Sequence, residues 1–162
     1  MRTLGLLSFL IGLVLCAACS PPAPIDEGEA AALAGIERHN VAVEQALSSG
    51  DVDALMAEIV DDAVWLPPGQ GPVEGKEAIR EFYEGLFSRV RLEGRLSPED
   101  REVVIMGDWA VFRGVLVGTV TPIEGGEPTP LANKVVNLLR REPDGTWRHV
   151  WDIWNSMPQG GS

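Results

Sequence analysis

Hydrophobic residues recur at helical spacing in the first half of the chain and at strand spacing in the second half. Apolar positions three, four and seven residues apart predict helices over residues 29–47, 52–60 and 76–87. Gly50 follows the first of these helices and suits the left-handed conformation in which many helices end. Asp51 then offers a side-chain cap for the second helix. The first half of the domain is therefore predicted to be mainly helical.

Strands are predicted mainly in the second half, with turn signals between them. The strand segments are residues 63–66, 90–96, 102–106, 109–121, 131–141 and 146–155. Asp144-Gly145, between the last two segments, is a strong hairpin signal. Helices grouped first and strands grouped last indicate an α+β fold, with three N-terminal helices packed on a strongly curved, mostly antiparallel sheet.

Residues 1–18 have the features of a signal peptide, with a short apolar stretch behind Arg2. The stretch ends in Cys16-Ala17-Ala18-Cys19, and two small residues before a cysteine are what a lipoprotein signal peptidase accepts. We therefore expect an exported protein of the cell envelope, anchored to the membrane by lipid at Cys19. Because Cys16 stands where Leu, Val or Ile is usual, a soluble secreted or periplasmic protein is the alternative.

The rest of the chain divides into a tether, one domain and a tail. Residues 19–28 hold the lipidated cysteine and a proline-rich tether, residues 29–158 form the folded domain, and residues 159–162 are expected to be a disordered tail. Both cysteines lie before the domain, which therefore has no disulfide, thiol nucleophile or cysteine metal site.

The net charge of -11 makes nucleic acid an unsuitable partner, because no basic stripe is present to neutralise phosphates. His39 and His149 are far apart in sequence, and neither has a second histidine at metal-ligand spacing. We interpret both as structural histidines. The sequence implies no metal and no cofactor.

A series of short motifs lies in a definite order at the turns and segment boundaries. They are Ser49-Gly50-Asp51-Val52-Asp53-Ala54-Leu55, Asp62-Ala63-Val64, Gly75-Lys76-Glu77-Ala78-Ile79, Gly107-Asp108-Trp109-Ala110, Gly114, Lys134, Arg140-Arg141, Asp144-Gly145-Thr146-Trp147 and Asp152-Ile153-Trp154-Asn155. Over about residues 30–156, this set resembles the SnoaL-like, or nuclear transport factor two-like, superfamily that includes ketosteroid isomerase. The resemblance implies a cone in which helices close one side of the curved sheet and leave a pocket. It also implies a homodimer formed through the outer face of the sheet.

Asp152 is the candidate catalytic residue. It lies between Trp151 and Trp154, where desolvation would raise the pKa of its carboxyl and suit it to proton transfer. The alternative is a structural ion pair between Asp152 and a neighbouring cation. The possible partners are Arg148, Arg113 and Lys134. Strict alternation along the last strand places Trp147, His149, Trp151, Ile153 and Asn155 on one face and Arg148, Val150, Asp152 and Trp154 on the other.

Polar and aromatic residues on the apolar faces are the candidates for lining the pocket. They are Asn40, Trp65, Tyr83, Arg113, Asn137 and Asn155. The resemblance to ketosteroid isomerase implies an Asp base, together with a Tyr and a protonated acid that bind the developing oxyanion. Tyr83, however, lies on the third predicted helix, whereas that tyrosine belongs on the first, where this chain has Asn40.

Two functions follow, with a third kept open. The favoured one is binding of a small apolar or amphipathic molecule, or simple association, at the cell envelope. The alternative is an isomerase, dehydratase or cyclase that uses Asp152 as its base. The third is a purely structural dimer module, which predicts a cone filled with side chains.

Overall fold

The structure is a computed structural model and describes residues 26–158. Its helices are α1 (Glu27–Ser49), α2 (Val52–Ala57) and α3 (Lys76–Phe87). The strands are β1 (Ile59–Leu66), β2 (Val73–Glu74), β3 (Val90–Leu96), β4 (Glu102–Met106), β5 (Trp109–Pro122), β6 (Thr129–Arg141) and β7 (Trp147–Ser156). This order confirms the predicted α+β fold. None of these helices is long and apolar enough to cross a membrane.

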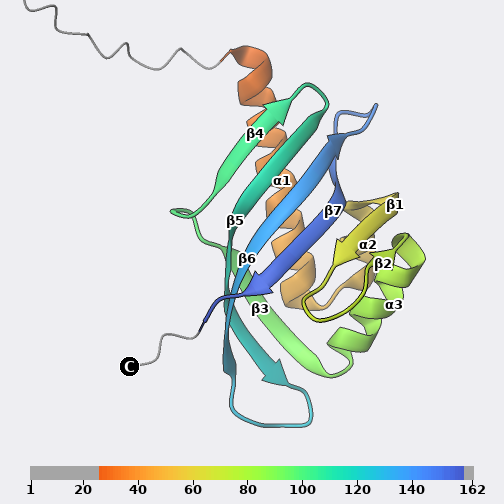
Figure 1. Ribbon diagram of the computed structural model, residues 1–162, viewed down its shortest axis with the longest axis vertical. Helices are drawn as coiled ribbons and strands as arrows, with labels where there is room; N and C mark the ends of the chain where they lie inside the picture. The colour runs from red at the N-terminus through yellow and green to blue at the C-terminus, as the bar shows by residue number, and fades with distance from the viewer. Residues whose placement is uncertain (1–25, 159–162) are drawn as a thin grey trace, which may run out of the picture.

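The strands form one sheet in the order β2-β1-β7-β6-β5-β3, with β4 paired to the other end of β5. All neighbouring pairs are antiparallel except β1 and β7, which are parallel. The two ends of the order do not pair, so the sheet is curved but not closed into a barrel. Helix α1 crosses one face of the sheet, while α2 and α3 lie beside β1 and β2 (Figure 1).

The ends of the helices follow from local capping. Asp26 accepts a hydrogen bond from the backbone N–H of Glu29, so α1 begins two residues before the predicted start. Gly50 ends α1 in the left-handed conformation, with φ of 69°. Helix α2 ends at Ala57 rather than at residue 60, because the chain turns there into β1. The backbone N–H of His149 donates to the Glu58 carbonyl, which joins this turn to β7.

A β-bulge in β7 overturns the strict alternation expected for that strand. Leu138 of β6 pairs with Trp151 and Leu139 pairs with His149, so Val150 is an extra residue. Beyond the bulge the two faces exchange, and Trp151 is exposed while Asp152 turns toward the interior. The prediction that His149 and Asp152 lie on opposite faces was therefore wrong, and both residues face the concave side.

Two apolar clusters fill the space between the helices and the sheet. One surrounds Leu55, Ile59 and Trp65, and includes the C-terminal end of α1. The other lies under the N-terminal half of α1 and contains Phe112 and Trp147. Trp154, half-buried, packs against both clusters.

Candidate binding cavity and a buried histidine pair

A layer of buried polar side chains separates the two apolar clusters. On α1, Ile36 belongs to one cluster and Leu47 belongs to the other. Two buried polar residues lie between these positions on the helix. The layer consists of His39 and Asn40 from α1, Asn137 from β6, and His149 and the part-buried Asp152 from β7. Since buried polar groups carry a desolvation cost unless they find partners, a layer of this kind marks a candidate functional site.

A small cavity of about 60 Å³ lies next to this layer, between α1 and the sheet. Its lining residues are Asn40, Val43, Glu44, Leu47, Leu96, Leu116, Val135, Asn137, His149 and Asp152. The walls are largely aliphatic, and the polar groups come from the middle of α1 and from β6 and β7. An apolar cavity with a few convergent polar groups is the usual form of a small-molecule site.

Asp152 and Asn137 form the polar pair of the cavity. The two residues are opposite each other in the β6–β7 register, and Nδ2 of Asn137 donates to Oδ1 of Asp152 over 2.6 Å. Burial raises the pKa of Asp152 from 3.8 to about 7, and the hydrogen bond from Asn137 opposes part of this rise. Near neutral pH the carboxyl is therefore divided between its protonated and ionised forms.

The structural ion pair considered for Asp152 was wrong, because the proposed partners lie elsewhere. Arg113 is on the outer face of β5, where its guanidinium contacts Glu102 at 2.6 Å. The guanidinium of Arg148 lies 3.9 Å from Asp144. Lys134 is exposed on β6, opposite Asn155 in the register. Arg113 and Asn155, two of the predicted pocket residues, therefore do not line the cavity.

Trp65 and Tyr83 form a buried pair beside the cavity rather than part of its lining. The indole N–H of Trp65 donates to the Tyr83 hydroxyl over 3.0 Å. Burial raises the pKa of Tyr83 above its usual range, and the nearby charge of Asp152 raises it further. Of the predicted site residues, Asn40, Asn137 and Asp152 thus meet at the cavity. Cys19 lies outside the described residues.

Sequence reasoning missed a hydrogen-bonded histidine pair. Nδ1 of His39 lies 2.7 Å from Oε2 of Glu58, and Nε2 of His39 lies 3.0 Å from Nδ1 of His149. Both imidazoles are buried, at 4% and 5% exposure. The available signal was His39 itself, which is adjacent to Asn40 and three positions after Ile36, and so falls on the buried side of α1.

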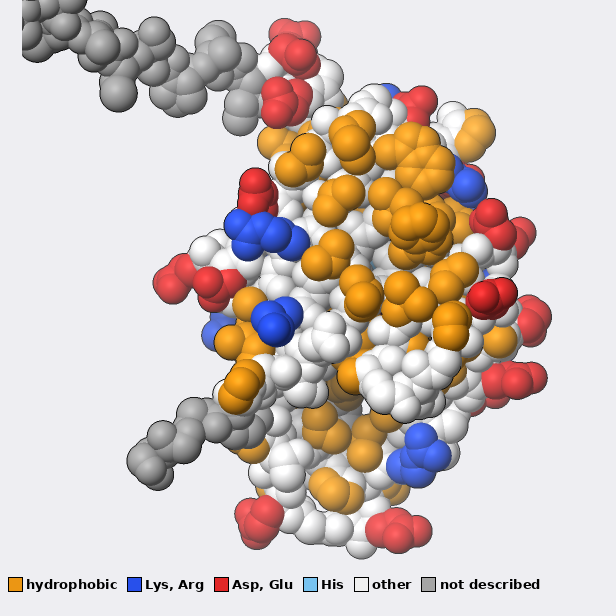
Figure 2. Space-filling view, in the orientation of Figure 1, with side chains coloured by type: hydrophobic (Ala, Val, Ile, Leu, Met, Phe, Trp, Pro, Cys, Tyr) orange, Lys and Arg blue, Asp and Glu red, His pale blue; other side chains and the backbone are white. Residues whose placement is uncertain are grey.

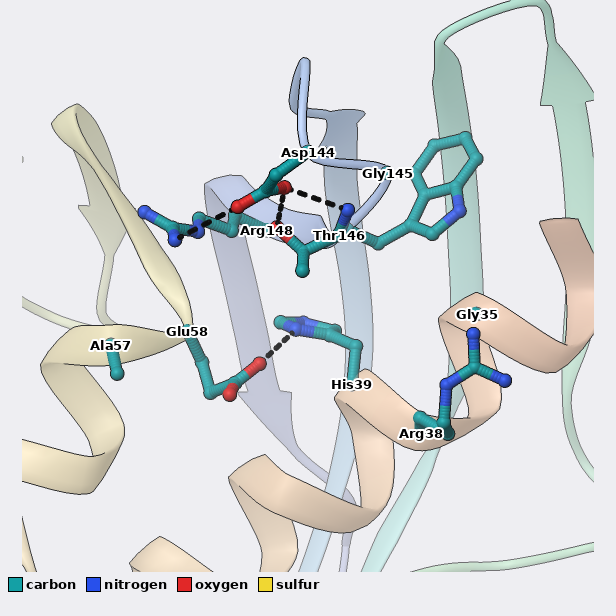
Figure 3. Close-up of a pocket in the computed structure, with 10 residues that line it drawn as sticks. Gly35, Arg38, His39, Ala57, Glu58, Asp144, Gly145, Thr146 and Arg148 are labelled. Carbon is teal, nitrogen blue, oxygen red and sulfur yellow. Dashed lines mark hydrogen bonds and ion pairs between the residues drawn. The ribbon is translucent and has the colours of Figure 1, made fainter.

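The outer side of this histidine pair faces a second, wider pocket of about 430 Å³. Figure 3 shows His39 and Glu58 meeting in its wall, below the β6–β7 turn that carries Asp144 and Thr146. Exposed charged side chains from α1 and the turn, Arg38 and Asp144, line this pocket. We take the smaller cavity as the candidate site, since its polar groups are buried and perturbed.

Within residues 26–158 no cluster of three or more His, Asp or Glu side chains is arranged to hold a metal ion. His39, His149 and Glu58 are consecutive members of a hydrogen-bonded chain rather than ligands around one centre. What the arrangement offers is hydrogen bonding and proton exchange at Asp152 and His149.

Comparisons with known proteins agree with the fold. No curated protein sequence matches the chain. The chain is similar to the structure of a ketosteroid isomerase-like protein from Erwinia carotovora atroseptica, with 31% identity and a TM-score of 0.70 over 77% of this chain and 95% of that one. Two further structures share the fold. A putative scytalone dehydratase from Novosphingobium aromaticivorans is 16% identical, with a TM-score of 0.69 over 77% and 83% of the two chains. A putative dehydratase of the NTF2-like family from Streptomyces avermitilis is 18% identical, with a TM-score of 0.67 over 77% and 96%.

The family follows from the sequence match. The pattern of the SnoaL-like domain matches residues 41–150, which run from the middle of α1 to the bulge of β7. This match spans more than half of the chain and includes Asn137 and His149, and it confirms the resemblance noted from the motifs. The chain belongs to the SnoaL-like domain family.

Proposed function

We propose that this protein binds a small molecule in the Asp152 cavity, where Asp152 and Asn137 hold its polar group. The observation that carries the proposal is the part-buried, hydrogen-bonded carboxyl of Asp152 in a cavity whose other walls are largely aliphatic. The Asp152 carboxyl has acceptor positions beyond the one that Asn137 fills, and a donor group on a bound molecule would offset the cost of burying them.

The size of the cavity limits the occupant. A volume of about 60 Å³ has room for roughly four water-sized groups. Pockets that enclose drug-sized ligands are typically ~300 Å³ or larger. The proposed occupant is therefore a very small molecule, or one end of a larger one, such as the hydroxyl end of phenol, whose remainder stays outside.

Binding is tested by titration with phenol, followed through backbone amide chemical shifts. We expect shifts centred on Asn137, Asp152 and their neighbours. Leu116→Trp fills the cavity and should abolish these shifts. The matched control is Val115→Trp, because the next residue along β5 points to the other face of the sheet. Unchanged phenol binding by Leu116→Trp would place the ligand elsewhere and contradict the proposal.

A second candidate function is proton transfer, with Asp152 as the base of a ketosteroid isomerase-like isomerase, dehydratase or cyclase. The observation that favours it is the pKa of about 7 for Asp152, which suits general acid–base catalysis at neutral pH. The set of oxyanion donors is weaker, because the Tyr83 hydroxyl does not line the cavity and Asn40 supplies only an amide.

The two candidates are separated by turnover of 3-cyclohexenone, whose isomerisation to the conjugated ketone is followed by ultraviolet absorbance. The enzyme candidate requires turnover that Asp152→Asn abolishes. Phenol binding without any turnover, and with affinity retained in Asp152→Asn, would leave the binding function alone.

The proposal includes a homodimer formed through the outer face of the sheet. Large apolar side chains gather on this face over β4 to β7 (Figure 2). They are Val104, Met106, Trp109, Val136, Trp151 and Ile153, which are 38–53% exposed. Exposed apolar patches of this kind are typical of protein interfaces. Sedimentation velocity should give a dimer that Trp151→Lys converts to monomer. Val41→Lys, at an exposed apolar position of α1, should leave the dimer intact. A monomeric wild-type protein would refute this part.

The proposal also places the protein in the cell envelope, anchored by lipid at Cys19. Its support is the apolar leader and the small residues before that cysteine. Metabolic labelling with palmitate should mark the wild-type chain and not Cys19→Ser. An exported chain without label would instead indicate a soluble secreted or periplasmic protein.

A further inference from the structure

Three hydrogen-bonded side chains connect the outer pocket with the Asp152 cavity. Glu58 and His39 lie in the wall of the outer pocket, and His149 lies in the wall of the cavity. The links measure 2.7 Å from Glu58 Oε2 to His39 Nδ1 and 3.0 Å from His39 Nε2 to His149 Nδ1. The three side chains come from the turn between α2 and β1, the middle of α1 and the residue before the bulge of β7.

The direction of the hydrogen bonds is set at the outer end of this chain. A carboxylate only accepts, so Nδ1 of His39 carries the hydrogen and donates it to Glu58. If the other nitrogen of the His39 imidazole carries no hydrogen, it accepts, and Nε2 of His39 then receives the Nδ1–H of His149. Burial lowers the pKa of His149 well below 6.5. His149 is therefore neutral, and its Nε2 bears a free lone pair.

That nitrogen is the one buried side-chain polar atom among residues 26–158 that has no hydrogen-bond partner. His149 is 5% exposed, and its ring makes an edge contact with Trp65, whose own N–H is taken by Tyr83. A buried acceptor without a donor destabilises the fold unless another molecule supplies one. The ring that carries this acceptor lines the cavity.

We infer that the ligand of the Asp152 cavity carries a hydroxyl or N–H group that donates to Nε2 of His149, and that Glu58 and His39 are positioning residues that keep this nitrogen an acceptor. The inference rests on the proposed binding function and adds the chemical class of the ligand. The other titratable side chains that line the cavity are those of Asp152 and Glu44, and both are acids. Within the described part of the chain, no Lys or Arg side chain lines the cavity to compete for the lone pair of His149.

The charged side chains of the outer pocket do not reverse the direction of these hydrogen bonds. Arg38, Asp144 and Arg148 line the outer pocket together with Glu58. Asp144 accepts from Thr146 and lies 3.9 Å from Arg148, and neither acid nor guanidinium replaces Glu58 as the partner of His39. The side chain of Glu58 is 24% exposed, whereas the two histidines are buried.

The first test reads the tautomer directly. In a spectrum that correlates side-chain nitrogens with ring protons, the wild-type protein at pH 7 should show His149 with hydrogen on Nδ1 and none on Nε2. Glu58→Ala removes the acceptor and should give a mixture of tautomers, whereas Glu58→Asp should retain the wild-type pattern. Asp62→Ala is the matched control, because it removes an exposed carboxylate from the strand that follows Glu58. A wild-type His149 with hydrogen on Nε2 would overturn the inference.

The second test compares phenol with toluene, which has the same shape and lacks the donor. Phenol should bind the wild-type protein roughly tenfold more tightly, as expected for one additional hydrogen bond to a buried group. Glu58→Ala should lose most of this preference and keep its affinity for toluene. Equal affinity of the wild-type protein for both probes refutes the inference and leaves the binding function standing. Failure of both probes to bind refutes the binding function, and the inference with it.

Discussion

The raised pKa of Asp152 predicts a specific pH dependence of stability. Well below pH 3.8 the carboxyl is protonated in both the folded and the unfolded chain. As the pH rises from 3.8 toward about 7, the unfolded chain releases its proton while the folded chain retains it. The unfolded state then binds fewer protons than the folded state, so the free energy of unfolding falls with rising pH. Above about pH 7 the loss is complete.

The magnitude follows from the two pKa values. A rise from 3.8 to about 7 corresponds to ~4 kcal/mol, because one pKa unit is worth about 1.4 kcal/mol. This is an upper limit, since the side chain is part-buried and the cavity opens to solvent. We therefore expect a change of about 2–4 kcal/mol. Asp152→Asn removes the titration and keeps an oxygen that can accept from Asn137.

The assay is urea unfolding of the purified protein, followed by tryptophan fluorescence from pH 4 to pH 8. Relative to the wild-type protein, Asp152→Asn should gain about 2–4 kcal/mol across this range. Glu124→Gln, in the exposed β5–β6 turn, should follow the wild-type profile. Parallel profiles for Asp152→Asn and the wild-type protein would refute the reasoning, because they would show that Asp152 titrates alike in the folded and unfolded chains.

Three further changes test side-chain contacts in the interior. Gly35→Ala would place a methyl group 2.7 Å from the Trp147 ring, and should destabilise the fold by about 1–3 kcal/mol in urea unfolding. A change below about 0.5 kcal/mol would mean that the ring moves freely. Asn137→Ala removes the hydrogen bond that lowers the pKa of Asp152, so carbon-detected NMR titration should place that pKa above about 7. Tyr83→Phe leaves a buried indole N–H without its acceptor, and should lower thermal stability by about 1–3 kcal/mol, with an unchanged melting temperature as the contrary result.

Local signals were sufficient for most of the fold. The bounds predicted for α3, β3 and β4 match the structure, because the apolar spacing and the turn residues between these segments agree. The errors lie where a distant strand decides the local structure. Ile59 and Val60 continue the pattern of a helix, but they join β1 because β7 lies alongside to pair with them. Nothing within that segment specifies its partner.

The site was only partly predictable for the same reason. Asp152 stood out because an acid between tryptophans is unusual, and Asn40 because it interrupts an apolar stripe. The link from His39 to Glu58 and His149 joins positions 19 and 110 residues apart, so it depends on the tertiary fold. The bulge at Val150 cannot be recognised from a single sequence, because the extra residue is as apolar as its neighbours in the core.

The bulge at Val150 changes which residues of β7 point into the cone. A strand of the same length without the bulge would alternate strictly, and its inner and outer sets of side chains would exchange from Val150 to the end of the strand. Trp151 would then enter the cone, and Asp152 would move to the face covered with apolar side chains. Deletion of Val150 instead removes the extra residue, restores strict alternation and leaves Trp151 outside and Asp152 inside. The site residues of a relative without this bulge therefore correspond to those of this chain beyond position 150 only when its sequence is aligned with a one-residue gap there.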